Sequence, residues 1–473
     1  MLDKATMRYR TLFIAFMVLG AALRIGMFWV NPPGNAFDNH FEPIKLIMDT
    51  GRIPGKLDCV ECYQPPVFYW TSAVIGDSLV ASGIATESNL AKFLQFLPCL
   101  YSITTLYVVF LILKLLPLSD FARLWSLGFL CFLPRHIYMS ALHSNDSLSY
   151  LAISVCVYGL GLVIANKHIS AAHLLLLSAI ISVTIFTKYT AFIIIPVVFL
   201  TFGLLPLRHP VTFAGSLTKG IAVLMLPLVL LGAYGASNKK IYGTALPFNA
   251  AIHNPAVFQP HDDPKYDLAT FKPWLFVSDP ILRPGQLNSF WTLMYAGMWF
   301  DTEPKLIVYA GNYEWWRTYY GWLNGQNLFP ADSATGPRHS LLHVGSYLEA
   351  LGLVPLGLGI TGLVFLTREV LRGADRTRES LLLLQMFLGL CIFDALVAAQ
   401  LALDVPVFSA MKSSYVLTAI PAFCAFVGFG IRACEKRSGG KIICGTLMGA
   451  LFSMVVVRVL QVTYWISAVT KRI

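Results

Sequence analysis

The feature that most constrains this chain is a series of apolar runs, each about 20 residues long. A helix of roughly 20 residues is what crosses the hydrocarbon core of a bilayer. We therefore predict an all-α polytopic membrane protein with about 11 transmembrane helices. The expected spans are 11–30, 92–113, 121–141, 147–165, 170–187, 189–206, 220–237, 344–366, 380–402, 414–432 and 442–465.

Composition excludes the main alternatives to a membrane protein. Hydrophobic residues make up 56% of the 473 residues and charged residues only 13%, about half the roughly 25% usual in soluble globular proteins. These values exclude a disordered chain, a collagen-like chain and an ordinary cytosolic enzyme. The formal net charge of +10 can signal nucleic-acid binding. Because no basic run carries interleaved aromatics outside a span flank, we expect no nucleic-acid partner.

The basic residues predict the orientation of the chain in the membrane. Positive side chains concentrate in the cytoplasmic loops of polytopic proteins. With the N-terminus in the cytoplasm, the loops of the opposite face carry little positive charge beyond Lys188 and Lys412. The cytoplasmic set is then Lys4, Arg8, Arg10, Lys114, Arg123, Lys167, Arg208, Lys219, Arg368, Arg372, Arg376, Arg378, Arg432, Lys436, Arg437 and Lys441.

Two long loops fall on the outer, non-cytoplasmic face. They cover residues 31–90 and 238–343, and the second is rich in aromatic residues. Large loops beside a membrane suggest chemistry or recognition at that face. We expect three parts, namely an N-terminal transmembrane module over 1–237, the long outer loop 238–343 and a C-terminal transmembrane module over 344–473. The stretch 65–85 is interpreted as an interfacial helix, since it begins with two prolines and contains an aspartate.

The first outer loop carries a cluster of titratable residues just after the first span. Asp38, His40 and Glu42 lie within about one helical turn of each other. Apolar residues with helical spacing follow over 44–48, and Gly51 then ends that pattern, which predicts a short amphipathic helix at the interface. Asp38 has two interpretations, as the N-cap of this helix or as a reactive carboxylate at the membrane surface.

A rigid turn followed by aromatics comes later in the same loop, as Gln64-Pro65-Pro66 and then Tyr69. The order of a span, a loop with Asp38, an interfacial helix, this turn and many further spans resembles the GT-C membrane glycosyltransferases. The resemblance is nearest to the family 39-like group, which includes protein O-mannosyltransferases and lipid A aminoarabinose transferases.

Two positions depart from the family pattern. Asn39 stands where a second acidic residue often follows the aspartate, and Gln64 stands where histidine is common. These departures bear on the acceptor more than on the reaction class.

The resemblance implies a reaction and a set of site residues. Asp38 matches the catalytic acidic position, and Asp146, in the short loop before the fourth span, matches a second acidic residue that faces the same cavity. Glu42 is a further candidate to assist. The donor implied is a sugar on a polyprenyl phosphate, and the acceptor is a hydroxyl of a lipid, glycan or protein. The sugar is transferred by direct displacement with inversion. From position alone, Asp146 is equally well explained as a helix cap.

Cations on the outer face are candidates for the donor phosphate. Lys412 is favoured, Lys188 comes second and Arg338 is a weaker candidate. Lysines at span ends commonly extend to the lipid headgroups without further role. Both lysines nevertheless lie on the face where topology does not need them, and a lipid phosphate would attract them. The remaining candidates are expected to position substrate, and they are His40, Gln64, Tyr69 and Tyr415.

Metal binding has little support in the sequence. No pair of histidines has metal-ligand spacing on one helix. A divalent cation could bind only if four side chains converge, namely those of Asp38, His40, Glu42 and Asp146. The sequence therefore does not predict a particular cofactor. Cys59 and Cys62 form a Cys-x-x-Cys without a second pair, which leaves a local disulfide or two free thiols.

Other functions are distinguished by particular features. A transporter or flippase for lipid-linked saccharides would carry charges or helix breaks in mid-span, and Asp394 is the clearest such charge. A polysaccharide polymerase would differ only in its product. A non-catalytic subunit would have lost Asp38 or the Gln64-Pro65-Pro66 turn. We expect a multi-pass protein of a bacterial inner membrane with its active face outside the cytoplasm.

Overall fold

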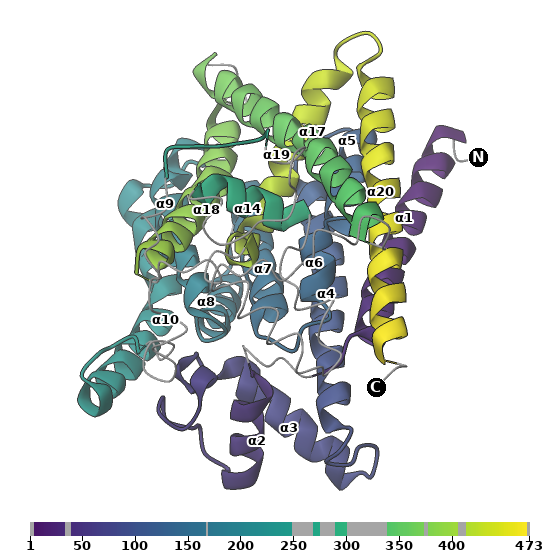
Figure 1. Ribbon diagram of the computed structural model, residues 1–473. Coiled ribbons are helices and arrows are strands. Elements are labelled where there is room, and N and C mark those ends of the chain that lie inside the picture. The colour runs from purple at the N-terminus through teal and green to yellow at the C-terminus, as the bar shows by residue number, and fades with distance from the viewer. Residues whose placement is uncertain are drawn as a thin grey trace.

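A computed structural model describes residues 4–33, 39–166, 169–247, 268–274, 289–299, 338–372, 377–404 and 413–470. All regular elements in these ranges are helices, arranged as a bundle (Figure 1). Within the ranges, nine helices are long and apolar enough to cross a membrane. The predicted class, an all-α polytopic membrane protein, is therefore confirmed, whereas the count of 11 stays a prediction.

The N-terminal half contains α1 to α10. In chain order its elements are α1 (Lys4–Val30), α2 (Phe41–Thr50), η1 (Val60–Tyr63), α3 (Val67–Ala81), α4 (Leu90–Leu115), α5 (Asp120–Cys131), α6 (Pro134–Met139), α7 (Asp146–Ala165), α8 (Ala171–Ile185), η2 (Tyr189–Ile193), α9 (Ile194–Leu204), η3 (Leu205–Leu207) and α10 (Phe213–Tyr242).

The C-terminal half contains α14 to α20. Its elements are α14 (Phe290–Trp299), α17 (Arg338–Leu371), α18 (Thr377–Asp404), η5 (Ser413–Ala419), α19 (Ile420–Glu435) and α20 (Gly440–Thr470). Helices α17 and α19 cross in close contact, because a Cβ added at Gly362 or Gly430 would overlap a backbone carbonyl of the facing helix. Small residues allow such approach between helices in a membrane.

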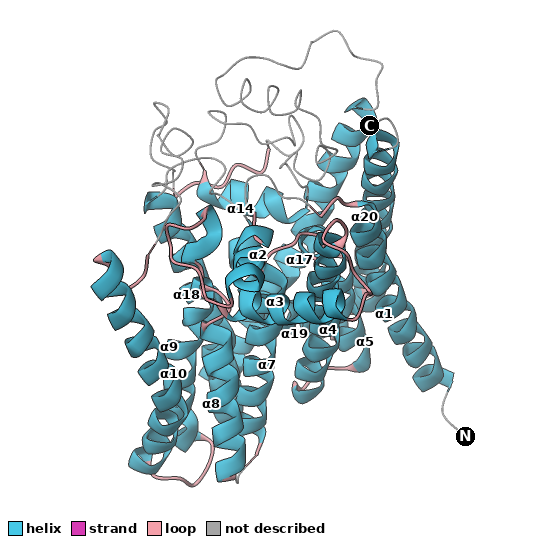
Figure 2. Cartoon of the chain, turned by 90° about the horizontal axis from the view of Figure 1, so that it is seen from below, coloured by secondary structure: helices cyan, strands magenta, loops and turns pink. Residues whose placement is uncertain are grey.

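The first outer loop forms a small helical unit at one end of the bundle. Figure 1 places α2 and α3 at the end opposite the start of α1, and Figure 2 views the bundle from that side. The apolar face of α2, which includes Ile44 and Ile47, packs on Phe68 of α3 and Leu94 of α4. As expected, α2 ends before Gly51, whose φ of 66° is left-handed. The N-cap position of α2 is His40, so Asp38 does not occupy it.

The expected span 121–141 is not one continuous helix. It divides into α5 and α6 at Phe132 and Leu133, and Pro134 begins α6. Proline at the first position of a helix is favourable because it has no amide hydrogen to leave unpaired, whereas inside a helix it breaks the hydrogen-bond ladder. The expected span 170–187 corresponds to α8, which is 15 residues long.

Arg24 on α1 stabilises the break between α5 and α6. Its guanidinium donates to the carbonyl oxygens of Leu130 at 3.1 Å and Cys131 at 3.1 Å, which belong to the last turn of α5. It also donates to the Gly20 carbonyl at 2.7 Å and to the Ser102 hydroxyl at 2.8 Å, and it lies 2.7 Å from Nδ1 of His136. Arg24 is 0% exposed. A buried arginine on an apolar helix is therefore matched by backbone carbonyls at the end of α5, where the regular helix ladder stops.

Candidate functional site

The centre of the candidate site is an ion pair between the start of α7 and the segment that follows α8. The Nζ atom of Lys188 lies 2.5 Å from Oδ1 of Asp146, and both side chains are 10% exposed. The two residues are 42 positions apart in sequence. A pair of this kind needs good geometry and further hydrogen bonds, because removing two charges from water is costly.

Local structure explains where both charges lie. Asp146 is the first residue of α7, where the helix dipole favours a carboxylate. Lys188 follows the end of α8 in an extended conformation, immediately before η2. Asn145 joins the two segments because its Nδ2 donates to the carbonyl oxygen of Thr187 at 3.1 Å.

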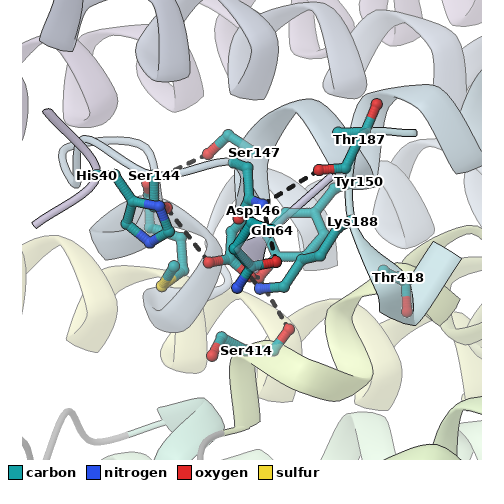
Figure 3. A network of polar contacts seen from close by, with 12 residues as sticks. His40, Gln64, Ser144, Asp146, Ser147, Tyr150, Thr187, Lys188, Ser414 and Thr418 are labelled. Carbon is teal, nitrogen blue, oxygen red and sulfur yellow. Dashed lines mark hydrogen bonds and ion pairs between the residues drawn. The ribbon is translucent and has the colours of Figure 1, made fainter. Parts of the chain in front are cut away.

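Neutral side chains complete the surroundings of Asp146. The Ser144 hydroxyl donates to Oδ2 at 3.2 Å. The Tyr150 hydroxyl lies 3.2 Å from Oδ1 of Asp146 and 2.8 Å from the carbonyl oxygen of Ser414. Figure 3 shows Asp146, Lys188, Tyr150 and Ser414 gathered in this way, with residues from both halves of the chain.

The turn η5 covers the pair from the C-terminal half. The Tyr415 ring centroid lies 5.4 Å from Nζ of Lys188, a distance at which a cation interacts with an aromatic face. Arg135 on α6 is a second buried cation. Its Nη2 lies 3.5 Å from the Ser414 hydroxyl, so it reaches the same turn. Asp394 on α18 anchors the end of the turn by accepting from the Thr418 hydroxyl at 2.5 Å and from the Ala419 amide at 3.1 Å.

The proline turn of the first outer loop docks against the same segment. The Val67 amide, just after Pro66, donates to the carbonyl oxygen of Phe186 at 3.0 Å. The Tyr189 hydroxyl donates to the carbonyl oxygen of Tyr63 at 2.9 Å. Gln64 Oε1 lies 3.5 Å from Nδ2 of Asn145. The turn that contains Gln64 is therefore adjacent to Asn145, the residue before Asp146 of the ion pair.

The two cysteines of the first outer loop are joined. Cys59 and Cys62 form a disulfide across η1. The disulfide closes the segment that leads into Gln64, and both cysteines are buried. Of the two states that the sequence left open, the structure has the disulfide.

A second group of rings lies where α2 and α3 meet the bundle. His40 Nδ1 lies 2.7 Å from the Tyr69 hydroxyl, and the two rings are stacked. His143 packs against the rings of Phe41 and Phe68. Neither ring nitrogen of His143 has a hydrogen-bond partner. Burial, with a smaller contribution from nearby His40, lowers the pKa of His143 to about 3.

The remaining predicted residues have different outcomes. Asp38 and Lys412 lie outside the described residues, and the side chain of Arg338, at the start of α17, does too. Glu42 is half-buried on the first turn of α2, and no described contact joins it to Asp146. The structure thus brings together Asp146, Lys188, Gln64 and Tyr415, and it places His40 and Tyr69 in the neighbouring ring cluster.

Among the described residues, no three His, Cys, Asp or Glu side chains are grouped so that they could hold a metal ion. The divalent site that the sequence left open required Asp38, His40, Glu42 and Asp146 to converge. Of these four residues, Asp38 lies outside the described ranges.

Sequence reasoning underestimated the residues that support the pair. Tyr150 and Ser414 were not singled out, although each hydrogen-bonds within the cluster. A usable signal existed for Tyr150, which lies one helical turn after Asp146 and therefore on the same face of α7. No signal in the sequence pointed to Ser414.

No protein-family model and no curated protein matches the chain. Several solved structures, however, have a similar fold. The apo oligosaccharyltransferase of Archaeoglobus fulgidus matches with a TM-score of 0.51 and 9% identity, over 97% of this chain and 56% of that chain. The chain has a GT-C fold. The same enzyme in complex with zinc and sulfate gives a TM-score of 0.50 and 10% identity, over 94% of this chain and 53% of that chain.

These matches define how far the likeness extends. The chain spans about half the length of the oligosaccharyltransferase that it matches, and identities of 9% and 10% show a shared fold alone. ArnT from Cupriavidus metallidurans, bound to undecaprenyl phosphate, covers 91% of this chain and 79% of that chain at 15% identity. Its TM-score of 0.37 is below the level at which a shared fold is inferred.

Proposed function

We propose that this GT-C chain is a membrane glycosyltransferase that moves a sugar from a polyprenyl-phosphate-linked donor to an acceptor hydroxyl on the non-cytoplasmic face. The observation that carries the proposal is the buried Asp146–Lys188 pair at the outer end of the bundle. The Gln64 turn docks beside this pair. The fold adds support, because the matched Archaeoglobus protein is itself an oligosaccharyltransferase.

The location of the site determines the kind of donor. Nucleotide sugars are not supplied outside the cytoplasm, so the sugar has to arrive on a lipid. A polyprenyl phosphate keeps its tail in the bilayer and presents its phosphate at the surface. We place the cluster beside Asp146 and Lys188 at the height of that phosphate. The cluster contains two buried cations, Lys188 and Arg135.

The proposed reaction is a single displacement. A carboxylate accepts the proton of the acceptor hydroxyl, and the oxygen then attacks the anomeric carbon. The bond from this carbon to the phosphate oxygen breaks, and the phosphate leaves with the electron pair. Asp38 is proposed as the base, with Asp146 or Glu42 assisting. Lys188 and Lys412 are proposed to stabilise the charge on the leaving phosphate, with Arg338 as a further candidate.

Lys188 is proposed to exchange partners during this cycle. In the structure its charge is compensated by Asp146 at 2.5 Å. A phosphate that enters beside Lys188 would share this cation and weaken its hold on Asp146. The carboxylate then becomes available to orient the acceptor, while His40, Gln64, Tyr69 and Tyr415 are proposed to position the sugar or the acceptor.

The cellular setting is part of the proposal. We place the protein in a bacterial inner membrane, with a cytoplasmic N-terminus and an active face in the periplasm or outside the cell. The acceptor is a hydroxyl on a lipid, a glycan or a protein.

Release of free polyprenyl phosphate tests the proposed function. Wild-type protein in nanodiscs is incubated with a panel of polyprenyl-phosphate sugars and with candidate acceptors. We expect release from one donor, and a loss of at least about 100-fold in Asp38→Asn. Asp77→Asn is the matched control, because Asp77 is an exposed aspartate on α3 in the same outer loop.

The outcomes separate the competing functions. Equal release by wild type and Asp38→Asn would remove Asp38 from the mechanism. If no donor is consumed but a labelled donor crosses the bilayer of a proteoliposome, the chain is a flippase instead. Asp394, the residue that favoured transport in the sequence, has both carboxylate oxygens engaged by η5, so the structure gives it a structural role.

A further inference from the structure

Gln95 is a buried glutamine on the second turn of α4 with an unusual number of polar contacts. It is 0% exposed. Its Nε2 lies 2.7 Å from the carbonyl oxygen of Ala141, 3.1 Å from that of Pro32 and 3.2 Å from that of Asn31. Its Oε1 accepts from Nζ of Lys92 at 2.8 Å. One side chain therefore contacts two chain segments that are remote in sequence.

Two neighbouring side chains reinforce these contacts. Asn31 Nδ2 donates to the same Ala141 carbonyl at 2.7 Å. Lys92 Nζ donates to the carbonyl oxygens of Phe28 at 2.5 Å and Asn31 at 2.7 Å. We call the side chains of Asn31, Lys92 and Gln95 the Gln95 clamp.

The two segments held by the Gln95 clamp lead directly into the two acidic loops. Asn31 and Pro32 follow the end of α1, and the chain continues from them to Asp38. Ala141 follows α6, and the chain continues from it to Asp146 at the start of α7. Bonds that join the two segments limit how far one can shift without the other.

We propose that Gln95 is a positioning residue, which holds the segment after α1 against the segment after α6 and so sets the placement of Asp146 relative to the start of the first outer loop. The expected effect on kcat rests on the proposed function. The coupling of the two segments by Gln95 is independent of that function.

The chemistry of the amide explains why glutamine suits this place. Two N–H groups on one nitrogen can face carbonyls of two segments at once, while the amide oxygen accepts from Lys92. Leucine has a similar size but no donor, and glutamate has no donor when ionised. Either substitution leaves buried carbonyls with fewer partners, and the segments then move to find others.

The test compares Gln95→Leu with Gln385→Leu in nanodiscs. Gln385 is the matched control, since it is a partly buried glutamine on α18 whose Oε1 accepts from the Thr201 hydroxyl at 3.2 Å. Three quantities are measured, namely kcat and KM for the donor, the melting temperature, and hydrogen exchange of the backbone over 27–33 and 139–145.

For Gln95→Leu we expect kcat to fall by about 10- to 100-fold, because a small misplacement of reacting groups costs that much. The donor KM should change less than kcat, since the clamp reaches Lys188 only through Asn145 and Asp146. Exchange should accelerate in both segments together and not over 59–64. Gln385→Leu should change neither kcat nor exchange in these segments.

Several outcomes would overturn the proposal. One is an unchanged kcat in Gln95→Leu. Another is a loss of kcat that only follows the folded fraction, with exchange faster throughout the protein. Faster exchange in one segment alone would show that the clamp does not couple them. If wild type turns over no donor, the proposed function has failed, and exchange in the two segments still decides whether Gln95 couples them.

Discussion

Two buried cations in this bundle have opposite kinds of partner. Arg24, in the second half of α1, donates to three backbone carbonyls and one hydroxyl and also contacts a histidine ring. Lys188, just after the end of α8, pairs with the carboxylate of Asp146. Both are shielded from solvent by apolar helices, but only Lys188 has a charged partner.

The difference indicates which cation is available for chemistry. Backbone carbonyls at a helix end cannot leave, so Arg24 is committed to holding α5 against α1. A carboxylate beside a cation can be replaced by another anion, and a phosphate is a suitable one. Under the proposed function, the Asp146–Lys188 pair stabilises the site before the donor binds and then admits the donor phosphate.

The largest effect is expected when the pair is neutralised. The double variant Asp146→Asn with Lys188→Met should lose at least about 100-fold in donor turnover. It should melt close to wild type, because replacing both charges leaves no uncompensated ion. Donor turnover and the melting temperature of the purified protein are the measurements.

The single variants provide the control for that prediction. Lys188→Met alone removes the cation nearest to Asp146 and should melt below the double variant. A double variant that keeps its activity would exclude the pair from the reaction. One that melts below both single variants would show that the pair is mainly structural.

The next effect concerns the other cation. Arg24→Leu removes hydrogen bonds to three buried carbonyls, at about 1 kcal/mol for each lost bond, so we expect roughly 3 kcal/mol of destabilisation. Melting of the detergent-solubilised protein measures it. Arg123→Leu is the control, since Arg123 forms an exposed pair with Asp120 on α5 and such pairs contribute about 1 kcal/mol or less. Equal melting of the two variants would contradict the assigned role of Arg24.

A smaller effect is expected from the disulfide of the first outer loop. The Cys59–Cys62 link closes a short loop, and loop-closure entropy for such a length corresponds to about 2 kcal/mol at most. A reducing agent should lower the melting temperature of wild type and leave that of Cys59→Ser with Cys62→Ser unchanged. If reduction affects both proteins equally, the disulfide is not the cause.

The smallest effect is a pH dependence from His143. Its pKa in the folded protein is about 3, below the ordinary value of 6.5, so the unfolded chain binds the proton more readily. The stability that follows from this difference is complete above pH 6.5 and is lost as the pH falls toward 3. Between pH 8 and pH 6 the loss should be about 1 kcal/mol.

Variants isolate the contribution of His143. His143→Phe should show a melting temperature that depends less on pH than that of wild type over this range. His173→Phe, which replaces an exposed histidine on α8, should behave as wild type. The same pH dependence in all three proteins would assign it to other groups.

Hydropathy predicted most of the fold because the bilayer imposes one length on every crossing. The expected span 147–165 is α7, observed over Asp146–Ala165. The prediction of one continuous helix over 121–141 was wrong. Hydropathy averaged over 20 residues does not register a single proline, and Pro134 divides that span. The interfacial helix after Asp38 was predicted from its spacing and its glycine stop, and α2 has both.

The candidate site was less predictable. Asp146 and Lys188 were each nominated, but for separate tasks, and nothing in a single sequence indicates that two loops 42 positions apart meet in an ion pair. Arg135 had no predictable orientation because its helix, α6, has only six residues. Gln95 looked like one polar residue in an apolar span, and only its three carbonyl partners show what it holds.

The break between α5 and α6 also has a consequence for biosynthesis. Arg24 emerges from the ribosome with α1, but the Cys131 carbonyl that it needs is 107 positions later in the chain. At about 5–20 residues per second, that interval lasts on the order of 5–20 s. An arginine at the centre of a lone helix costs about 2.5–3.5 kcal/mol on insertion. We therefore expect α1 to enter the membrane before Arg24 has its partners. Its final depth in the bilayer would then be set only after α5 has been synthesised and has packed against it.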